Sequence, residues 1–138
     1  MLRKATVLVI VVTLILASLP ITGVLAKGNN EMLEAKWDQL ITNFNRQSFN
    51  HNGVHNWVAE WLYDHKNASA SQKAEVRWHL AICNSALASA QTIVWRHAGF
   101  DASGNVIDRG LAIKSIKDLG YYLQKHAGSV KNLQEHIK

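Results

Sequence analysis

The chain of 138 residues contains a single proline, Pro20, so no proline interrupts the sequence that follows it. Proline is the residue that most strongly opposes a helix interior, because it lacks an N–H donor and its ring clashes with the preceding turn. The sequence after Pro20 also contains few runs of β-branched residues, which are typical of strands. We therefore expect this part of the chain to be all-α.

The segment before the proline has a different character. A basic start (residues 3–4) precedes an apolar run over residues 5–19, and the short residues Val24 and Ala26 occupy the positions that a signal peptidase reads. This order is typical of a secretory signal peptide, whereas a membrane-spanning helix usually needs about 20 apolar residues. We expect residues 1–26 to be a signal peptide cleaved after Ala26. The alternative is a retained anchor, and both cases place residues 27–138 in the periplasm or outside the cell.

Residues 27–138 are enough for one modest domain, which we expect to be a single all-helical one. This part has one cysteine, Cys83, so no internal disulfide can form and stability must come from an apolar core. We expect Cys83 to be buried, the alternative being a pairing with another chain. The formal charge of +5 is modest and partly comes from the basic start. Since no cluster of Lys and Arg occurs, we expect no nucleic-acid binding.

The spacing of apolar residues predicts a compact bundle of four main helices plus a short C-terminal helix. The first helix begins near Glu31 and ends at the polar stretch "NRQSFNHNG" (residues 45–53), which we expect to be a loop. The other main helices are expected over about residues 54–66, 70–98 and 108–126. Gly128 and Ser129 then separate the short last helix.

Two local patterns predict how these helices are joined. Ser69 and Gln72, three residues apart, have the signature of a capping box at a helix start. Gly99 is suited to end that helix, because glycine adopts the left-handed conformation without strain. The connection that follows contains "ASGN" (residues 102–105), whose glycine and asparagine favour a tight turn or a two-strand tip.

Seven histidines raise the question of a metal site. His51 and His55 are four residues apart, as are His79 and Cys83, and this spacing places two side chains on one face of a helix. However, Gly53 weakens a helix between the first pair, and no third ligand has a spacing that forces it nearby. Neither HExxH nor CxxC occurs. We therefore expect no metal and no cofactor.

The sequence also favours a non-catalytic protein. The thiol of Cys83 would need an accessible position and a low pKa to act as a nucleophile, but it lies on the apolar stripe of a helix. No serine lies in a nucleophile elbow, and no glycine-rich phosphate loop occurs. Acidic residues near the start of the first helix suit the positive end of its dipole. We expect no catalytic residues.

Tryptophan is the residue type that most suggests binding, because all five tryptophans lie in residues 27–138. Trp57 and Trp61 are one helical turn apart in "WVAEWLYDH", and they are followed by Tyr63. Their bulk could be used entirely in the core, but together these residues span more than one helix face. We expect one of the two tryptophans to be buried and the other exposed for binding. The candidate binding residues are Trp57, Trp61, Tyr63, His51 and His55.

These observations favour an exported, non-catalytic helical protein that binds another macromolecule, a protein or another envelope component, in the cell envelope or outside the cell. Inhibitors, immunity proteins and lysis regulators belong to this class. Two alternatives stay open, a membrane-active secreted factor of the bacteriocin type and a metal-binding helical bundle. Membrane contact is not favoured, because membrane-surface helices concentrate Lys and Arg on their polar face, whereas acidic and basic residues are mixed here.

Overall fold

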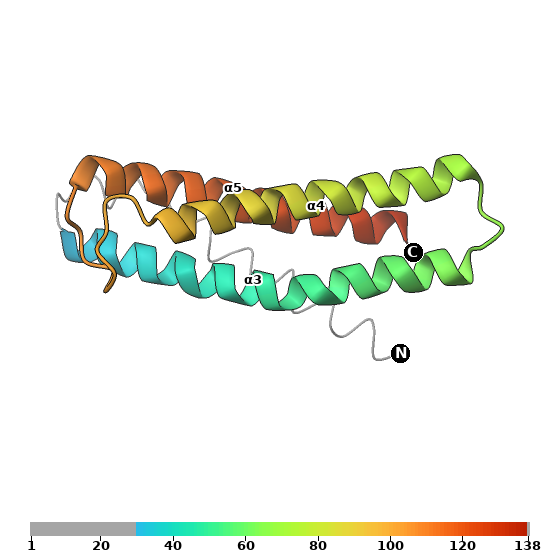
Figure 1. Ribbon diagram of the computed structural model, residues 1–138, viewed down its shortest axis with the longest axis horizontal. Coiled ribbons are helices and arrows are strands. Elements are labelled where there is room, and N and C mark those ends of the chain that lie inside the picture. Colours follow the sequence, from blue (N-terminus) through green and yellow to red (C-terminus); the bar gives the residue numbers. More distant parts are fainter. Residues whose placement is uncertain (1–29, 138) are drawn as a thin grey trace.

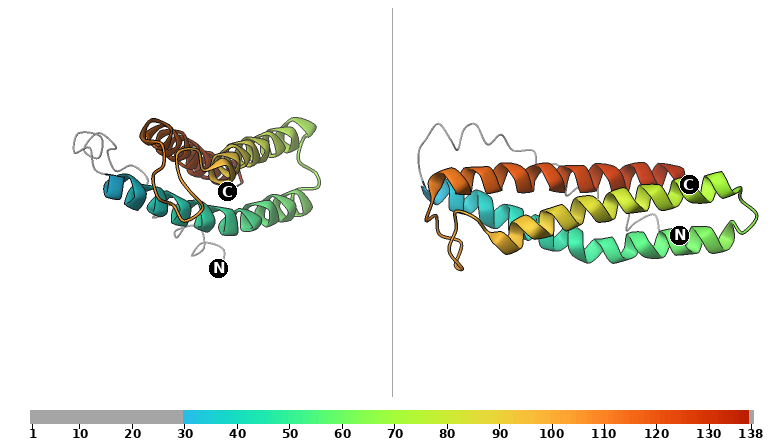
Figure 2. Two further views of the ribbon diagram at one scale, coloured as in Figure 1. Left: turned by 60° about the vertical axis from the view of Figure 1, so that its left-hand side comes forward. Right: turned by 45° about the horizontal axis from the view of Figure 1, so that its top comes forward.

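A computed structural model describes residues 30–137 of the protein. This part of the chain folds into three long helices, α3 (Asn30–Asp64), α4 (Ala70–Arg96) and α5 (Arg109–His136) (Figure 1). Helices α4 and α5 lie side by side, and α3 packs along this pair (Figure 2). The prediction of an all-α protein is confirmed. The predicted signal peptide lies outside the described residues.

The described residues do not form four main helices and a short fifth one. The stretch over residues 45–53 is not a loop but continues the first helix into the second, which gives the 35-residue α3. Gly53 lies inside this helix, where it costs about 1 kcal/mol relative to alanine. Buried apolar residues on both sides of the stretch outweigh that cost. Its two buried polar residues, Gln47 and His51, have partners on the other helices.

The predicted break at Gly128 and Ser129 is also wrong, since α5 continues through both residues. The Ser129 hydroxyl donates to the carbonyl oxygen of Lys125 at 2.7 Å, so it is satisfied within the helix. Val130 and Leu133, which follow, are almost completely buried. Their packing keeps the last turns of the helix continuous despite the glycine.

The predicted capping box at the start of α4 is confirmed. The N–H of Gln72 donates to Ser69 Oγ at 3.1 Å, and the N–H of Ser69 donates to Gln72 Oε1 at 3.0 Å. The other end of the helix differs from the prediction, because His97 adopts the left-handed cap conformation with φ 35°. Gly99 has φ 91° in the turn that follows. A Cβ at this position would lie 2.1 Å from the backbone nitrogen of Ala112, so only glycine is accommodated.

Of the two predicted forms of the connection between α4 and α5, the structure shows the tight turn and not a two-strand tip. The carboxylate of Asp101 accepts hydrogen bonds from the N–H groups of Ser103 and Asn105, both at 2.9 Å. Phe100 and Val106 form an isolated antiparallel bridge on either side of this turn. Phe100 is 1% exposed, so the turn is anchored in the core.

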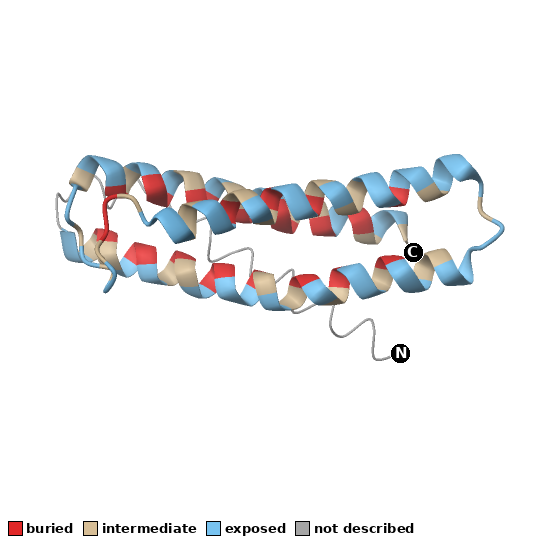
Figure 3. Ribbon diagram, in the orientation of Figure 1, coloured by how far each residue is buried: buried red, intermediate tan, exposed pale blue. Residues whose placement is uncertain are grey.

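Two clusters of apolar side chains form the core. The buried residues lie mostly on the faces that the helices turn toward one another (Figure 3). The first lies toward the start of α3 and includes Leu33, Trp37, Leu40, Phe100, Ile116 and Leu119. The second lies toward the α3–α4 turn and comprises Val54, Val58, Val76, Cys83, Val130 and Leu133. Between them, along α3 and α5, lie buried polar residues. Within residues 30–137, no helix has the combination of length and apolar content that crossing a membrane requires.

Candidate functional site

The five candidate binding residues lie in two different places. His51, which is buried, and His55, which is exposed, belong to a polar network in the middle of the bundle. Trp57, Trp61 and Tyr63 lie on the last two turns of α3, near the turn to α4. The structure therefore divides the predicted site into an internal part and a surface part.

The surface part lies toward the end of the bundle at which α3 and α4 extend past the end of α5 (Figure 1). With a rise of about 1.5 Å per residue, the 35-residue α3 is about 52 Å long and the 28-residue α5 about 42 Å long. The last residue of α5, His136, contacts Glu75 of α4, so the residues of α4 before Glu75 lie beyond the third helix. We call residues 57–73 the hairpin tip. Over the outer part of this tip, the described chain supplies no third helix.

The apolar side chains of the hairpin tip are incompletely covered. Trp57, Trp61 and Leu62 are half-buried and pack against the edge of the second core cluster. The two tryptophans thus do not divide into one buried and one exposed residue, as the sequence suggested. Among the tryptophan and tyrosine side chains of the hairpin tip, Tyr63 is the exposed one, at 69%. The end of the hairpin consists mostly of exposed residues (Figure 3).

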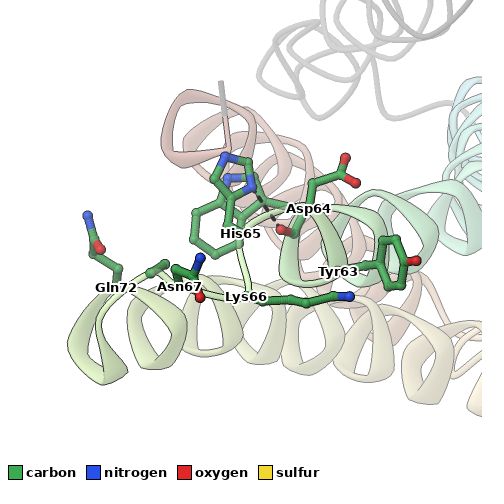
Figure 4. Close-up of a pocket in the computed structure, with 8 residues that line it drawn as sticks. Tyr63, Asp64, His65, Lys66, Asn67 and Gln72 are labelled. Atoms are coloured by element: carbon green, nitrogen blue, oxygen red, sulfur yellow. Dashed lines mark hydrogen bonds between the residues drawn. The ribbon is translucent and has the colours of Figure 1, made fainter.

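Contacts within the tip hold several of these side chains in place. The imidazole of His65 stacks on the Trp61 indole, with ring centroids 4.4 Å apart, and its Nδ1–H donates to the Trp61 carbonyl oxygen at 2.8 Å (Figure 4). The Nζ of Lys66 lies 4.3 Å from the centroid of the Tyr63 ring, a cation–π contact. Lys73 in turn donates to the carbonyl oxygen of Lys66 at 2.5 Å. Side chains ordered in this way lose little further freedom when a partner binds.

An open pocket of about 630 Å³ lies at the hairpin tip. Its lining consists of Trp61, Tyr63, Asp64, His65, Lys66, Asn67, Ala68 and Gln72. The Tyr63 ring and the Gln72 amide lie at opposite ends of this group, and the polar side chains between them do not converge on one point (Figure 4). Small-molecule sites enclose the ligand and aim a few polar groups at it. This lining is therefore better suited to a broad contact with another macromolecule.

The internal part of the predicted site is a hydrogen-bonded chain between α3 and α5. Gln47 Nε2 donates to Asn43 Oδ1 at 3.3 Å, and Gln47 Oε1 lies 2.7 Å from Nδ1 of His126. The Nε2 atom of His126 lies 2.9 Å from Nδ1 of His51. His126 is 2% exposed and Gln47 is 5% exposed, so these contacts lie inside the bundle, between the two core clusters.

The hydrogen-bonded chain continues to α4. The Oδ1 atom of Asn84 lies 2.6 Å from Nε2 of His51 and 2.8 Å from Nε2 of His55. The two histidine rings, four residues apart on α3, meet edge to face with centroids 4.9 Å apart. The predicted pairing of His51 and His55 on one helix face is therefore real, but their common partner is an amide oxygen. Through His126 and Asn84, one row of polar residues on α3 is joined to both other helices.

The N–H hydrogens of this hydrogen-bonded chain can be arranged in two ways. In the first, the amide oxygens of Gln47 and Asn84 lie at the two ends, so each must accept a hydrogen bond from a ring N–H. The two rings of His51 and His126 then carry three N–H hydrogens, one more than two neutral imidazoles have, and the pair has one positive charge. In the second, the oxygen and nitrogen atoms of the Gln47 and Asn43 amides are exchanged, so the Gln47 NH2 group donates to Nδ1 of His126. Each ring then carries only one N–H hydrogen and is neutral. This neutral arrangement also gives a hydrogen-bond acceptor to the buried Asn43 Nδ2, which otherwise has no partner.

Burial decides between the two arrangements. The pKa of His126 is lowered from 6.5 to about 4, first by desolvation and second by the neighbouring His51. Desolvation is also the largest cause of the lowered pKa of His51. We infer that both rings are neutral at neutral pH, and that acid adds a charge to the interior of the bundle.

Cys83 and His79, the other residues considered from the sequence, lie outside this hydrogen-bonded chain. Cys83 is completely buried, as predicted, and burial raises the pKa of its thiol to about 11. A protonated, inaccessible thiol is unsuited to nucleophilic chemistry. The ring of His79, one turn before it, contacts the rings of Trp78 and His136.

Sequence reasoning missed Gln47, Asn84 and His126 as members of the internal chain. A signal for part of it was present, because Asn43, Gln47, His51 and His55 follow one another at intervals of four, as one row on a helix must. Nothing in the sequence pointed to Asn84 and His126 as the residues that this row meets. No model of a known protein family matches the chain, and no curated protein or solved structure shows significant similarity to it.

Proposed function

We propose that this is an exported, non-catalytic helical protein that binds a partner protein in the cell envelope or outside the cell, and that the hairpin tip is its binding surface. The observation that carries this proposal is the position of Trp57, Trp61 and Tyr63. They lie on the last two turns of α3, where the two tryptophans pack only against the edge of the second core cluster and the described part of α5 does not extend over the outer part of the tip.

The composition of the hairpin tip supports a protein-binding role. Recognition surfaces have an apolar centre with a polar rim, and tryptophan and tyrosine supply much of the binding energy. Here the incompletely covered centre is Trp57, Trp61 and Leu62, and the exposed Tyr63 borders it. The rim includes the acidic, basic and amide side chains of Asp64, Lys66, Asn67 and Gln72.

An apolar helix of the partner would suit this surface best. Along most of their length α3 and α4 pack against α5, and at the tip an added helix could continue the same packing. The rim carries both signs of charge, on Asp64 and Lys66, whereas membrane-surface helices concentrate basic residues on the polar face. A protein partner is therefore favoured over a lipid surface.

A matched pair of tyrosine variants tests this proposal. Tyr63→Ala removes an aromatic ring at the hairpin tip, whereas Tyr121→Ala removes one on α5 that is 58% exposed. Both side chains are exposed, so neither change should reduce stability by more than about 0.5 kcal/mol. A tagged protein, purified from the envelope fraction of cells that produce it, should recover the partner with the wild type and with Tyr121→Ala. Recovery with Tyr63→Ala should be lower by about 30-fold, since truncating a hot spot costs about 2 kcal/mol. Equal recovery, or an equal loss with both variants, would contradict the assignment of the tip.

Export is tested separately. If the signal peptide is removed after Ala26, the exported protein begins at Lys27. Intact-mass measurement of the protein recovered outside the cytoplasm should show the loss of residues 1–26. Recovery of the full-length mass from the membrane fraction would instead identify a retained anchor.

A further inference from the structure

Two histidines and a glutamate converge near the end of α5. They are Glu75 and His79, which are four residues apart on α4, and His136, in the last turn of α5. One ligand atom from each side chain lies within 4.8 Å of the other two. The rings of His79 and His136 lie with centroids 4.0 Å apart. Among the described residues, no other group of three His, Cys, Asp or Glu side chains comes together in this way. We call Glu75, His79 and His136 the trio.

The geometry of His136 suits a metal ligand. Its Nδ1–H donates to the carbonyl oxygen of Asn132 at 2.9 Å, which leaves Nε2 as the atom that faces Glu75. Histidines that bind metals usually donate their other ring N–H to a carbonyl or carboxylate, which fixes the ring orientation and the tautomer. The Nε2 atom then lies 3.2 Å from Glu75 Oε1. Two such acceptor atoms come this close only when a cation, a proton or a metal ion, bridges them.

We propose that Glu75, His79 and His136 form a binding site for a divalent transition-metal ion such as Zn²⁺. Two imidazole nitrogens and one carboxylate oxygen are a common set of three protein ligands for this ion. Glu75 and His136 are exposed and His79 is half-buried, so the site is accessible from solvent. A water molecule or a donor from another molecule would complete the coordination.

The sequence alone gave no reason to expect this site. Glu75 and His79 supply two ligands at helical spacing, but His136 is 61 residues from Glu75 along the chain. The packing of α5 on α4 supplies the missing third ligand. A bound ion would therefore join the last turn of α5 to α4. This inference does not depend on the proposed binding role of the hairpin tip.

The test is a Zn²⁺ titration of the chelator-treated protein, prepared without a histidine tag. Equilibrium dialysis should show one zinc ion per chain. Glu75→Gln, His79→Ala and His136→Ala should each raise the dissociation constant by about 100-fold or more, because even the loss of an outer-shell partner costs about 10–100-fold. As matched controls, His55→Ala and His65→Ala should leave the affinity unchanged, since both residues lie outside the trio.

Two further readouts keep the result interpretable. Zinc at about 100 times its dissociation constant should raise the Tm by on the order of 10 °C in the wild type and leave the trio variants unchanged. Without zinc, the melting curves of all variants should remain cooperative, which excludes misfolding as the cause. The proposal is wrong if no saturable binding is found, if the trio variants keep the affinity, or if only the control variants lose it.

Discussion

Trp37→Ala should destabilise the protein more than the same change at any of the other four tryptophans. Trp37 is 5% exposed and belongs to the first core cluster. Its ring stacks on that of Phe100, with centroids 4.5 Å apart and planes at 12°. Removing a large buried aromatic ring costs about 3–5 kcal/mol. Because Phe100 belongs to the connection between α4 and α5, the change also removes an aromatic contact between this connection and α3.

Denaturation of Trp37→Ala and Trp95→Ala gives a matched comparison. Trp95 is 72% exposed, so its replacement should change the free energy of unfolding by no more than about 0.5 kcal/mol. The Trp37 variant should lose on the order of 15 °C in Tm, given about 4–8 °C per kcal/mol for a domain of roughly this size. Similar losses in the two variants would show that the first core cluster is not arranged as described.

Acid should destabilise the bundle through His126. The pKa of this residue in the folded protein, about 4, lies below the value of 6.5 expected in the unfolded chain. A lowered pKa means that the folded state binds the proton less well than the unfolded state does. Its contribution is therefore fully present above pH 6.5 and is lost progressively as the pH falls toward 4. A shift of this size corresponds to about 3 kcal/mol.

His126→Gln isolates this contribution, because glutamine keeps a polar side chain but cannot take up the proton. The free energy of unfolding should fall by about 3 kcal/mol more in the wild type than in this variant between pH 6.5 and 4. Titrating carboxylates contribute to both curves and cancel in the difference. His65→Gln serves as the control for the same replacement at an exposed position of the hairpin tip. Parallel curves for wild type and His126→Gln would exclude a buried neutral histidine as the acid-sensitive group.

The parts of the fold that local chemistry determines were predictable. The absence of proline after Pro20 and the spacing of apolar residues indicated an all-α protein, and the structure agrees. The pair Ser69 and Gln72 identified the start of α4, because both partners of a capping box lie within one turn. The turn at Asp101 was equally local. In each of these cases the partners lie at most four residues apart in the sequence.

The errors arose where partners lie far apart in the sequence. The polar stretch in the middle of α3 resembled a loop because its hydrogen-bond partners, His126 and Asn84, lie on other helices. Gln47 and His126 are 79 residues apart, and no spacing rule connects them. The division of the candidate site has a similar origin. How far Trp57 and Trp61 are exposed depends on where α5 ends relative to the α3–α4 turn, which is a property of the packed bundle.

Site-specific photocrosslinking tests the role of the hairpin tip most directly. The photoreactive residue benzoylphenylalanine replaces Tyr63 in one protein and Tyr121 in another, and both are irradiated in the cells that produce them. The two positions are comparably exposed, at 69% and 58%. We expect one discrete adduct with a second protein from position 63 and none from position 121. The absence of an adduct at position 63, or the same adducts from both positions, would contradict the conclusion that the hairpin tip is the binding surface.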